Sequence, residues 1–269
     1  MQSEYDLLVT NASLNGNAAT VDIGITDGVI KSIEADIPGD ADQVIDANGN
    51  FVSPGLVDCH LHIDRAFSSV GERKPVGWEQ SATAKDYNRL FNEYYKDISA
   101  EELERKATKN VRRAVKYGTT HMRSHVCVDH PSGLTNMEAC LETYENTADI
   151  VDLQLAVMPS KGIVNDESFD LVEGAVRRGV ERTSPESILV GGVDPASRNQ
   201  DVEETIRRWF DIATTYDVGI DVHIQDGGTV GIHTLEQLIE KTKTFEYEGR
   251  VTASHCFSLA HIPEFRRLI

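Results

Sequence analysis

From residue 56 onward, short apolar segments alternate with longer amphipathic segments, and this alternation limits the folds open to the chain more than any other feature. Strands that alternate with helices are typical of parallel βα units. The strand-like segments span 56–62, 120–126, 151–158, 188–193, 219–224 and 250–255. The helix-like segments span about 99–117, 135–148, 166–181, 200–216 and 231–243. We therefore expect an α/β fold built on one parallel sheet.

The first of these helices has signals at both of its ends. Ser99 and Glu102 form a capping box, which is typical of a helix N-terminus. Gly118 follows Tyr117 and is a natural stop, because glycine adopts the left-handed conformation that ends many helices. The pattern predicts a helix between these two points.

Two arrangements of parallel strands compete, a closed barrel and an open doubly wound sheet. A doubly wound sheet usually has a glycine-rich phosphate loop after its first strand, and none follows residues 56–62. The sequence therefore favours a (β/α)8 TIM-type barrel. Such a barrel has eight strands, whereas the chain supplies six before Ile269. We expect a barrel truncated after strand 6, so that either the chain is a fragment or the barrel is incomplete.

The first fifty residues have a different character. Residues 5–12, 21–25, 29–35 and 43–52 alternate apolar and polar side chains around glycine and asparagine turns, one of them at Asp27-Gly28. This pattern predicts a small antiparallel sheet that ends at Pro54-Gly55. The expected domains are residues 1–53, as the N-terminal part of a small β-sandwich, and residues 54–269, as the incomplete barrel.

The charge excludes one large class of partner. Aspartate and glutamate number 44 against 26 lysines and arginines, which gives a net charge of −18. Neutralising phosphates requires a cationic surface, so we expect no nucleic-acid partner. The acidity fits either a high-salt cytoplasm or an ordinary acidic enzyme.

The sequence lacks the features that are typical of membrane, secreted and zinc-ribbon proteins. No apolar run approaches the roughly 20 residues of a membrane span, and the N-terminus lacks a signal-like segment, so we expect a cytoplasmic protein without membrane contact. The four cysteines form no CxxC pair, which argues against a zinc ribbon or a disulfide framework. The oligomeric state stays open, and a homo-oligomer is compatible with the sequence.

Histidines recur at the ends of three predicted strands. His60 and His62 share one face of their strand, because successive side chains in a strand alternate. His223 and His255 stand at the ends of the fifth and sixth predicted strands. In a barrel of this type the carboxyl ends of the strands carry the chemistry. A lone histidine is usually structural, but agreement among three strand ends indicates a metal site.

Several segments resemble the amidohydrolase superfamily, and specifically its cytosine deaminase-like branch. The three that contain these histidines are PGLVDCHLHID (54–64), VHIQDGG (222–228) and TASHCFSLA (252–260). GWEQSAT (77–83), HMRSHVCVD (121–129) and DLQLAVMPSKGI (152–163) occur in the same order as in that branch. The resemblance covers nearly the whole chain and implies a metal-dependent hydrolase with a barrel fold.

The resemblance also implies roles for individual residues. His60, His62 and His223 would bind a divalent metal ion, zinc or iron, which lowers the pKa of a bound water from about 16 to about 7. Asp226 occupies the position of a proton-shuttling carboxylate that is usually glutamate in the family. His255 would orient the attacking water. The family takes a further aspartate from strand 8, so we expect the chain alone to be inactive or nearly so.

Three residues are candidates for contact with the substrate. Ser160 replaces the glutamine with which cytosine deaminase reads the pyrimidine, and a serine lacks that paired amide donor and acceptor, so cytosine is a poor candidate. Trp78 matches a segment that covers the pocket, although plain packing would also explain it. Asp64 completes an HxHxD pattern, with a role either near the substrate or as a cap. By contrast, Arg123 and His125 are expected to hydrogen-bond within the barrel.

The predicted function is hydrolysis of a C–N bond in a small heterocyclic or cyclic amide substrate, by deamination or ring opening. Removal of an N-alkyl amine from a triazine-like ring is an alternative that the same site could perform. A non-catalytic, truncated remnant of such an enzyme is the alternative from another class.

Overall fold

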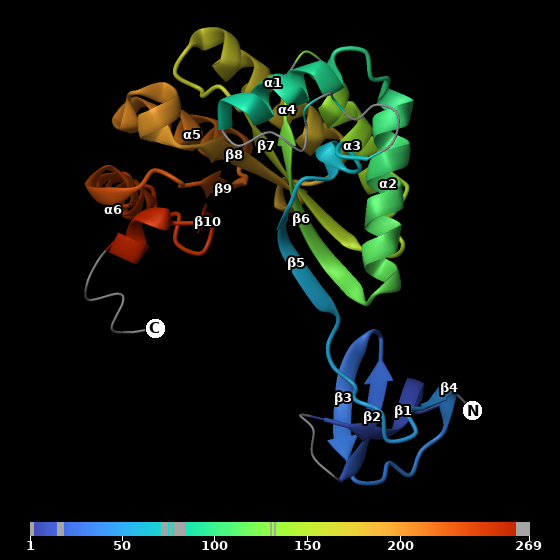
Figure 1. Cartoon of the computed structure of the whole chain (residues 1–269). Helices are drawn as coiled ribbons and strands as arrows, with labels where there is room; N and C mark the ends of the chain where they lie inside the picture. The colour runs from blue at the N-terminus through green and yellow to red at the C-terminus, as the bar shows by residue number, and fades with distance from the viewer. Residues whose placement is uncertain are drawn as a thin grey trace. The chain divides into compact units, whose positions relative to one another are not determined.

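The computed structural model describes residues 3–14, 19–70, 75, 77, 84–129, 131 and 133–261 (Figure 1). The chain divides into two compact units, residues 1–55 and 56–269. Each unit contains its own sheet. None of the helices within the described ranges combines the length and the apolar character needed to cross a membrane.

The first unit contains a four-stranded sheet in the order β3-β2-β1-β4. Its strands are β1 (Tyr5–Ser13), β2 (Thr20–Thr26), β3 (Val29–Glu34) and β4 (Ala41–Asp46). β1–β2 and β2–β3 are antiparallel, but β1 and β4 are parallel. The expectation of a wholly antiparallel sheet was therefore wrong. The chain passes from β3 to the opposite edge and enters β4 in the direction of β1, which no local turn signal reveals.

The second unit contains a parallel sheet whose strand order follows the chain, from β5 at one edge to β10 at the other. Its strands are β5 (Leu56–Leu61), β6 (Thr119–Cys127), β7 (Asp152–Met158), β8 (Ile188–Val193), β9 (Gly219–His223) and β10 (Val251–Ser254). The connecting helices are α2 (Ala100–Lys116), α3 (Thr135–Glu145), α4 (Asp166–Arg182), α5 (Val202–Tyr216) and α6 (Gly228–Thr244). The predicted alternation of strands and helices is confirmed.

Local signals explain where the helices begin. The Ser99 side chain accepts a hydrogen bond from the backbone N–H of Glu102 at 3.2 Å, as the capping box predicts. Asn165 caps α4 and Asp201 caps α5 in the same way. Helix α1 (Ala84–Tyr95) was not predicted, because no cap or stop signal was recognised in its sequence.

The six-stranded sheet is strongly curled. In a flat sheet five interstrand spacings of roughly 4.8 Å would place β5 and β10 roughly 24 Å apart. Yet the rings of His60 on β5 and His255 directly after β10 lie 4.7 Å apart, measured between centroids. The fold is therefore an α/β half-barrel, with α2 to α5 packed against the outer face of the sheet (Figure 1).

The core lies between the curled sheet and its helices. Val126, Val157 and Val222 point outward from the strands and are completely buried against the helices. β8 is buried along its whole length, as expected for a strand covered on both faces. Gly192 in β8 has no room for a side chain, because an added Cβ would overlap the indole of Trp209. This packing fixes the strand ends that carry the histidines.

Candidate metal centre

Two of the predicted strand ends bring three histidines together on the inner face of the sheet. His60 lies in β5, His62 follows that strand directly, and His223 is the last residue of β9. His223 and Val222 are neighbours in β9, so their side chains point to opposite faces, Val222 to the core and His223 inward. One ring nitrogen from each of the three histidines lies within 4.8 Å of the others.

The closest approach joins His62 and His223, whose Nε2 atoms are 3.4 Å apart. Two imidazoles that bind one tetrahedral ion at 2.0–2.1 Å have their nitrogens roughly 3.3–3.4 Å apart. The Nδ1 atoms of His60 and His62 are buried without a hydrogen-bond partner among the described residues. His223 Nδ1 lies 3.2 Å from the carbonyl oxygen of Gly192 and can donate to it, which directs Nε2 toward the cluster. This donor set fits a divalent metal ion.

Burial keeps these imidazoles in the form that binds metals. Loss of hydration lowers the pKa of His223 to about 3, with a further contribution from His60. The pKa of His62 lies well below its usual value, and that of His60 is also lowered, in both cases chiefly through burial. Neutral imidazole has a free nitrogen lone pair, so the cluster is ready for a cation without first losing protons.

A second layer of polar side chains lies deeper in the half-barrel. The His125 ring on β6 is 4.3 Å from that of His223, measured between centroids, and its Nε2 is 3.6 Å from an oxygen of Asp221. Arg123 contacts the other Asp221 oxygen at 2.9 Å and donates to Gln154 at 2.9 Å. The prediction of hydrogen bonds within the barrel is confirmed for Arg123. It was wrong for His125, whose two ring nitrogens are buried without a hydrogen-bond partner among the described residues. His60, His125 and Asp221 form a second group of potential ligands.

The three histidines line a cavity of about 360 Å³. Its other lining residues are Arg65, Met158, Ser160, Val193, Arg198, Gln225 and His255. Among the predicted residues, His255 and Ser160 therefore lie at the same cavity as the three histidines. His255 has a φ of 72° and the next residue, Cys256, a φ of 48°. Two successive left-handed residues at a strand end are costly, and such strain is common at functional sites.

The other predicted residues lie elsewhere. Asp226 is buried, and its Oδ2 accepts a hydrogen bond from the backbone N–H of Ala196 at 3.0 Å; it is not among the residues that line the cavity. Asp64 is also buried outside the lining, where its Oδ2 accepts from the backbone N–H of Cys127 and from the hydroxyl of Tyr95. Trp78 lies outside the described residues.

Two arginines at the cavity were missed by the sequence reasoning. Arg65 follows His62 by three residues in a short 3-10 helix, Ile63–Arg65. Arg198 lies in a turn of π-helix, Pro195–Asn199, that follows β8. The only sequence signal for Arg65 was its closeness to the histidine pair. For Arg198 there was none, since the turn after β8 could not be placed.

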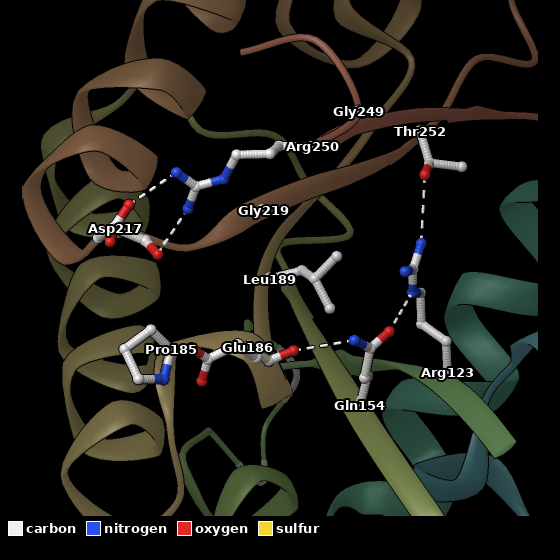
Figure 2. A pocket seen from close by; sticks show the side chains of 10 residues that line it. All are labelled: Arg123, Gln154, Pro185, Glu186, Leu189, Asp217, Gly219, Gly249, Arg250 and Thr252. Carbon is white, nitrogen blue, oxygen red and sulfur yellow. Dashed lines mark hydrogen bonds and ion pairs between the residues drawn. The ribbon is translucent and has the colours of Figure 1, made fainter. Parts of the chain in front are cut away.

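A second cavity, of about 320 Å³, lies at the amino ends of the strands (Figure 2). Both of its arginines are paired with carboxylates. Arg250 contacts Asp217 at 2.7 Å, and Gln154 donates to the carbonyl oxygen of Glu186 at 2.8 Å (Figure 2). Arg123, at its edge, is paired with Asp221. Ligands of parallel α/β folds bind at the carboxyl ends of the strands, so the histidine cavity is the candidate site.

Comparison with known proteins gives a consistent picture. The chain is 39% identical over 264 residues to the N-isopropylammelide isopropyl amidohydrolase of Pseudomonas sp. (strain ADP), an alignment that covers 98% of this chain and 64% of that protein. The structure is similar to that of 5-methylcytosine deaminase from Klebsiella pneumoniae, with a TM-score of 0.76 and 27% identity over 97% of this chain and 62% of the other.

A further similar fold is that of N-isopropylammelide isopropylaminohydrolase from Burkholderia multivorans, with a TM-score of 0.81, 24% identity, and coverage of 99% of this chain and 64% of the other. The chain thus spans slightly less than two thirds of the length of these proteins. The profile of the amidohydrolase family matches residues 51–267, which include all the histidines of the cavity. This chain belongs to the amidohydrolase family.

Proposed function

We propose that this chain carries the metal-binding half of a hydrolase that cleaves a C–N bond of a small heterocyclic substrate with an activated water molecule. The observation that carries the proposal is the 3.4 Å separation of the Nε2 atoms of His62 and His223, with His60 completing the group. That geometry, at the carboxyl edge of a parallel sheet in a member of this family, matches a site for one divalent ion.

The metal would be zinc or iron. Imidazole nitrogens suit both ions, and the His60–His62–His223 group contains no carboxylate that would favour magnesium or calcium. Held by His60, His62 and His223, such an ion would lower the pKa of a bound water enough for that water to act as a nucleophile near neutral pH.

The surrounding side chains would handle protons and the substrate. His255 stands 4.7 Å from His60 and 5.1 Å from His223, measured between ring centroids, where it can hydrogen-bond to the attacking water. Asp226 Oδ2 already accepts from Ala196, so proton transfer to the leaving nitrogen would use its Oδ1. The Ser160 hydroxyl donates to Asp129 at 2.9 Å, which leaves its lone pairs as acceptors for a substrate N–H.

The half-barrel would be six strands of an eight-stranded barrel, and the four-stranded sheet one layer of a β-sandwich. The curl of the parallel sheet supports the barrel assignment, and the similar folds, which come from longer chains, are compatible with both assignments. On this proposal two further strands and the aspartate that the family takes from strand 8 lie outside these residues. Turnover by residues 1–269 alone would then be slow or absent.

Two alternatives remain from the sequence. Removal of an N-alkyl amine from a triazine-like ring is favoured by the 39% identity to N-isopropylammelide isopropyl amidohydrolase. A non-catalytic remnant would have no use for converging imidazoles, so it is the weaker alternative. Asp64 and Trp78 stay predictions for substrate contact.

The test is a paired measurement on purified, metal-loaded protein. Released ammonia and released alkylamine are quantified separately for aminopyrimidines, N-alkylaminotriazines and cyclic amides, and the metal content is determined on the same sample. Bound zinc or iron that chelation removes and reloading restores supports the proposal, and any amine release, expected to be slow in residues 1–269 alone, should follow the metal content. Protein that binds no metal after incubation with either ion would remove its basis.

A further inference from the structure

Among the described residues, the lining of the histidine cavity includes two guanidinium groups and no carboxylate. Arg65 and Arg198 are among its ten lining residues, and none of the ten is acidic. The remaining lining side chains are imidazoles, the hydroxyl of Ser160, the amide of Gln225 and the apolar walls formed by Met158 and Val193. The permanently charged groups among these ten lining residues are therefore the two guanidinium groups, and both are positive.

Arg65 has no anionic hydrogen-bond partner among the described residues. Its Nη2 donates to the sulfur of Cys127 at 3.3 Å, and its guanidinium stacks over the ring of Phe91 at 4.5 Å. Burial raises the pKa of Cys127 to about 12, so that sulfur belongs to a neutral thiol. Arg65 Nε is buried and has no partner among the described residues. The stack on Phe91 fixes the plane of the guanidinium while leaving part of its hydrogen-bonding capacity unused.

Carboxylates lie near both arginines, but they are engaged with other groups. Asp64 is attracted to Arg65, yet its Oδ2 accepts from Cys127 and Tyr95. Asp194 lies near Arg198, and its Oδ1 accepts from the backbone N–H of Gln225 at 2.6 Å. The described contacts contain no hydrogen bond from either guanidinium to either carboxylate. These carboxylates therefore offset part of the positive charge of Arg65 and Arg198 without accepting hydrogen bonds from their guanidinium groups.

The overall charge of the molecule would work against an anion. A net charge of −18 repels negative ligands, so any preference for an anion has to come from local cations. The cavity volume of about 360 Å³ lies at the small end of the range for ligand sites, roughly 300–1,000 Å³, which suits a single ring.

We propose that Arg65 and Arg198 make the cavity selective for a planar, single-ring substrate that carries a negative charge on its ring oxygens. The charged edge of the ring would bind the guanidinium groups, and the Met158 and Val193 side chains would contact its faces. In this orientation the carbon of the scissile C–N bond would face His60, His62 and His223. The inference rests on the proposed function, because it names the substrate class of the same site.

The test compares two rings of equal size in binding experiments on metal-free protein. Barbiturate is an anion at pH 7, whereas uracil is a neutral pyrimidine ring. Isothermal titration calorimetry after chelation measures both dissociation constants, which excludes any anion–metal bond and needs no turnover. We expect barbiturate to bind about a hundredfold more tightly than uracil, as for two charge-assisted interactions of about 1.4 kcal/mol each.

Three variants assign the preference to the two arginines. Arg65→Met and Arg198→Met should each reduce the barbiturate-to-uracil preference about tenfold. Arg65→Lys keeps the charge but loses the planar stack on Phe91, so it should reduce the preference less than Arg65→Met does. Arg177→Met is the matched control, because Arg177 is an exposed residue of α4 whose loss changes the net charge equally. If Arg65→Met does not fold, Arg65→Lys and Arg198→Met show whether the arginines cause the preference for the anion.

Equal binding of the two rings to the unaltered protein, or an unchanged preference in Arg198→Met and in every folded Arg65 variant, would overturn the inference. The proposed function can fail independently. Hydrolysis of a neutral ring without a preference for anions would refute only the arginine assignment. A strong preference for barbiturate in protein that binds no metal would refute only the proposed metal-dependent hydrolase activity.

Discussion

The Nε2 atoms of His62 and His223 lie 3.4 Å apart, although 161 positions separate the two residues in the chain. Each follows or ends a strand of the same parallel sheet, and the strands are β5 at one edge and β9 near the other. Only a strongly curled sheet can bring these strand ends together. The imidazoles therefore converge because the sheet of the half-barrel is curled.

The first prediction concerns metal content. Unaltered protein should bind about one zinc or iron per chain, and His223→Ala should bind less than about a tenth of that amount, because a tetrahedral site rarely survives the loss of one of three protein ligands. His233→Ala is the matched control, since His233 is exposed on α6. Inductively coupled plasma mass spectrometry after gel filtration measures the stoichiometry. Full metal content in folded His223→Ala protein would contradict the assigned ligand set.

The sequence was sufficient to predict every strand of the parallel sheet and the convergence of the histidines. Parallel strands end at the same edge, so histidines at the ends of β5 and β9 had to share that edge once the βα alternation was recognised. The capping box at Ser99 predicted the start of α2 correctly, because a cap depends only on residues close in sequence. These features depend on periodicity and on hydrogen bonds between residues close in sequence.

Features that depend on tertiary contacts could not be predicted. Arg65 reaches the cavity because its guanidinium is held between Phe91 and Cys127, which are distant in the chain. The direction of β4 depends on its pairing with β1. Asp226 was expected at the cavity from its spacing after His223, but whether its side chain faces the cavity depends on the loop that brings Ala196 to it.

A second prediction tests the packing beneath the site. Gly192→Ala should destabilise the protein by about 1–3 kcal/mol, because the added methyl group overlaps the Trp209 indole. It should also weaken metal binding about 10- to 100-fold, since the Gly192 carbonyl orients His223. Gly174→Ala is the control. An added Cβ there meets nothing within 4 Å in helix α4, so we expect a gain of about 0.5–1 kcal/mol. Urea unfolding and metal titration measure the two effects.

A third prediction concerns the ion pair between Arg123 and Asp221. The Asp221 side chain is completely buried, so Arg123→Met leaves an uncompensated charge and should cost about 3–5 kcal/mol of the free energy of unfolding. The double variant Arg123→Met with Asp221→Asn should recover much of that loss. The exposed Arg177→Met variant should change stability by less than about 0.5 kcal/mol. Urea unfolding curves at pH 7 are measured for the unaltered protein, both single variants, the double variant and Arg177→Met. Strictly additive effects of the two core substitutions would contradict the pairing.

A fourth prediction concerns thiol reactivity. Cys59 is exposed, whereas Cys127 and Cys140 are buried, and burial raises the pKa of both buried thiols. The reactive form is the thiolate, so at pH 8 a disulfide reagent such as DTNB should modify Cys59 rapidly and the two buried thiols only after unfolding. Cys256, partly buried, should react at an intermediate rate. Cys59→Ser should lack the fast phase, and rapid modification of Cys127 in the folded protein would contradict the neutral partner assigned to Arg65.

The last prediction is a pH dependence of stability on the surface of α5. Hydrogen bonds from Arg207 and Arg208 lower the pKa of Glu204 to about 2. The stabilisation from such a depressed pKa is fully present above the unfolded-state value of about 4.3 and is lost as the pH falls toward 2. Since Glu204 is partly exposed, Glu204→Gln should cost no more than about 1 kcal/mol at pH 7.

The difference between the unaltered protein and Glu204→Gln should therefore shrink steadily as urea unfolding is repeated at pH 7, 5, 4 and 3. Glu203→Gln is the matched control, because it removes the same charge from the same helical turn at an exposed position. Its small effect should not follow the same curve. A stability difference for Glu204→Gln that stays constant down to pH 3 would mean that the two arginines stabilise the glutamine as well as the carboxylate, and the ionic contribution would be refuted.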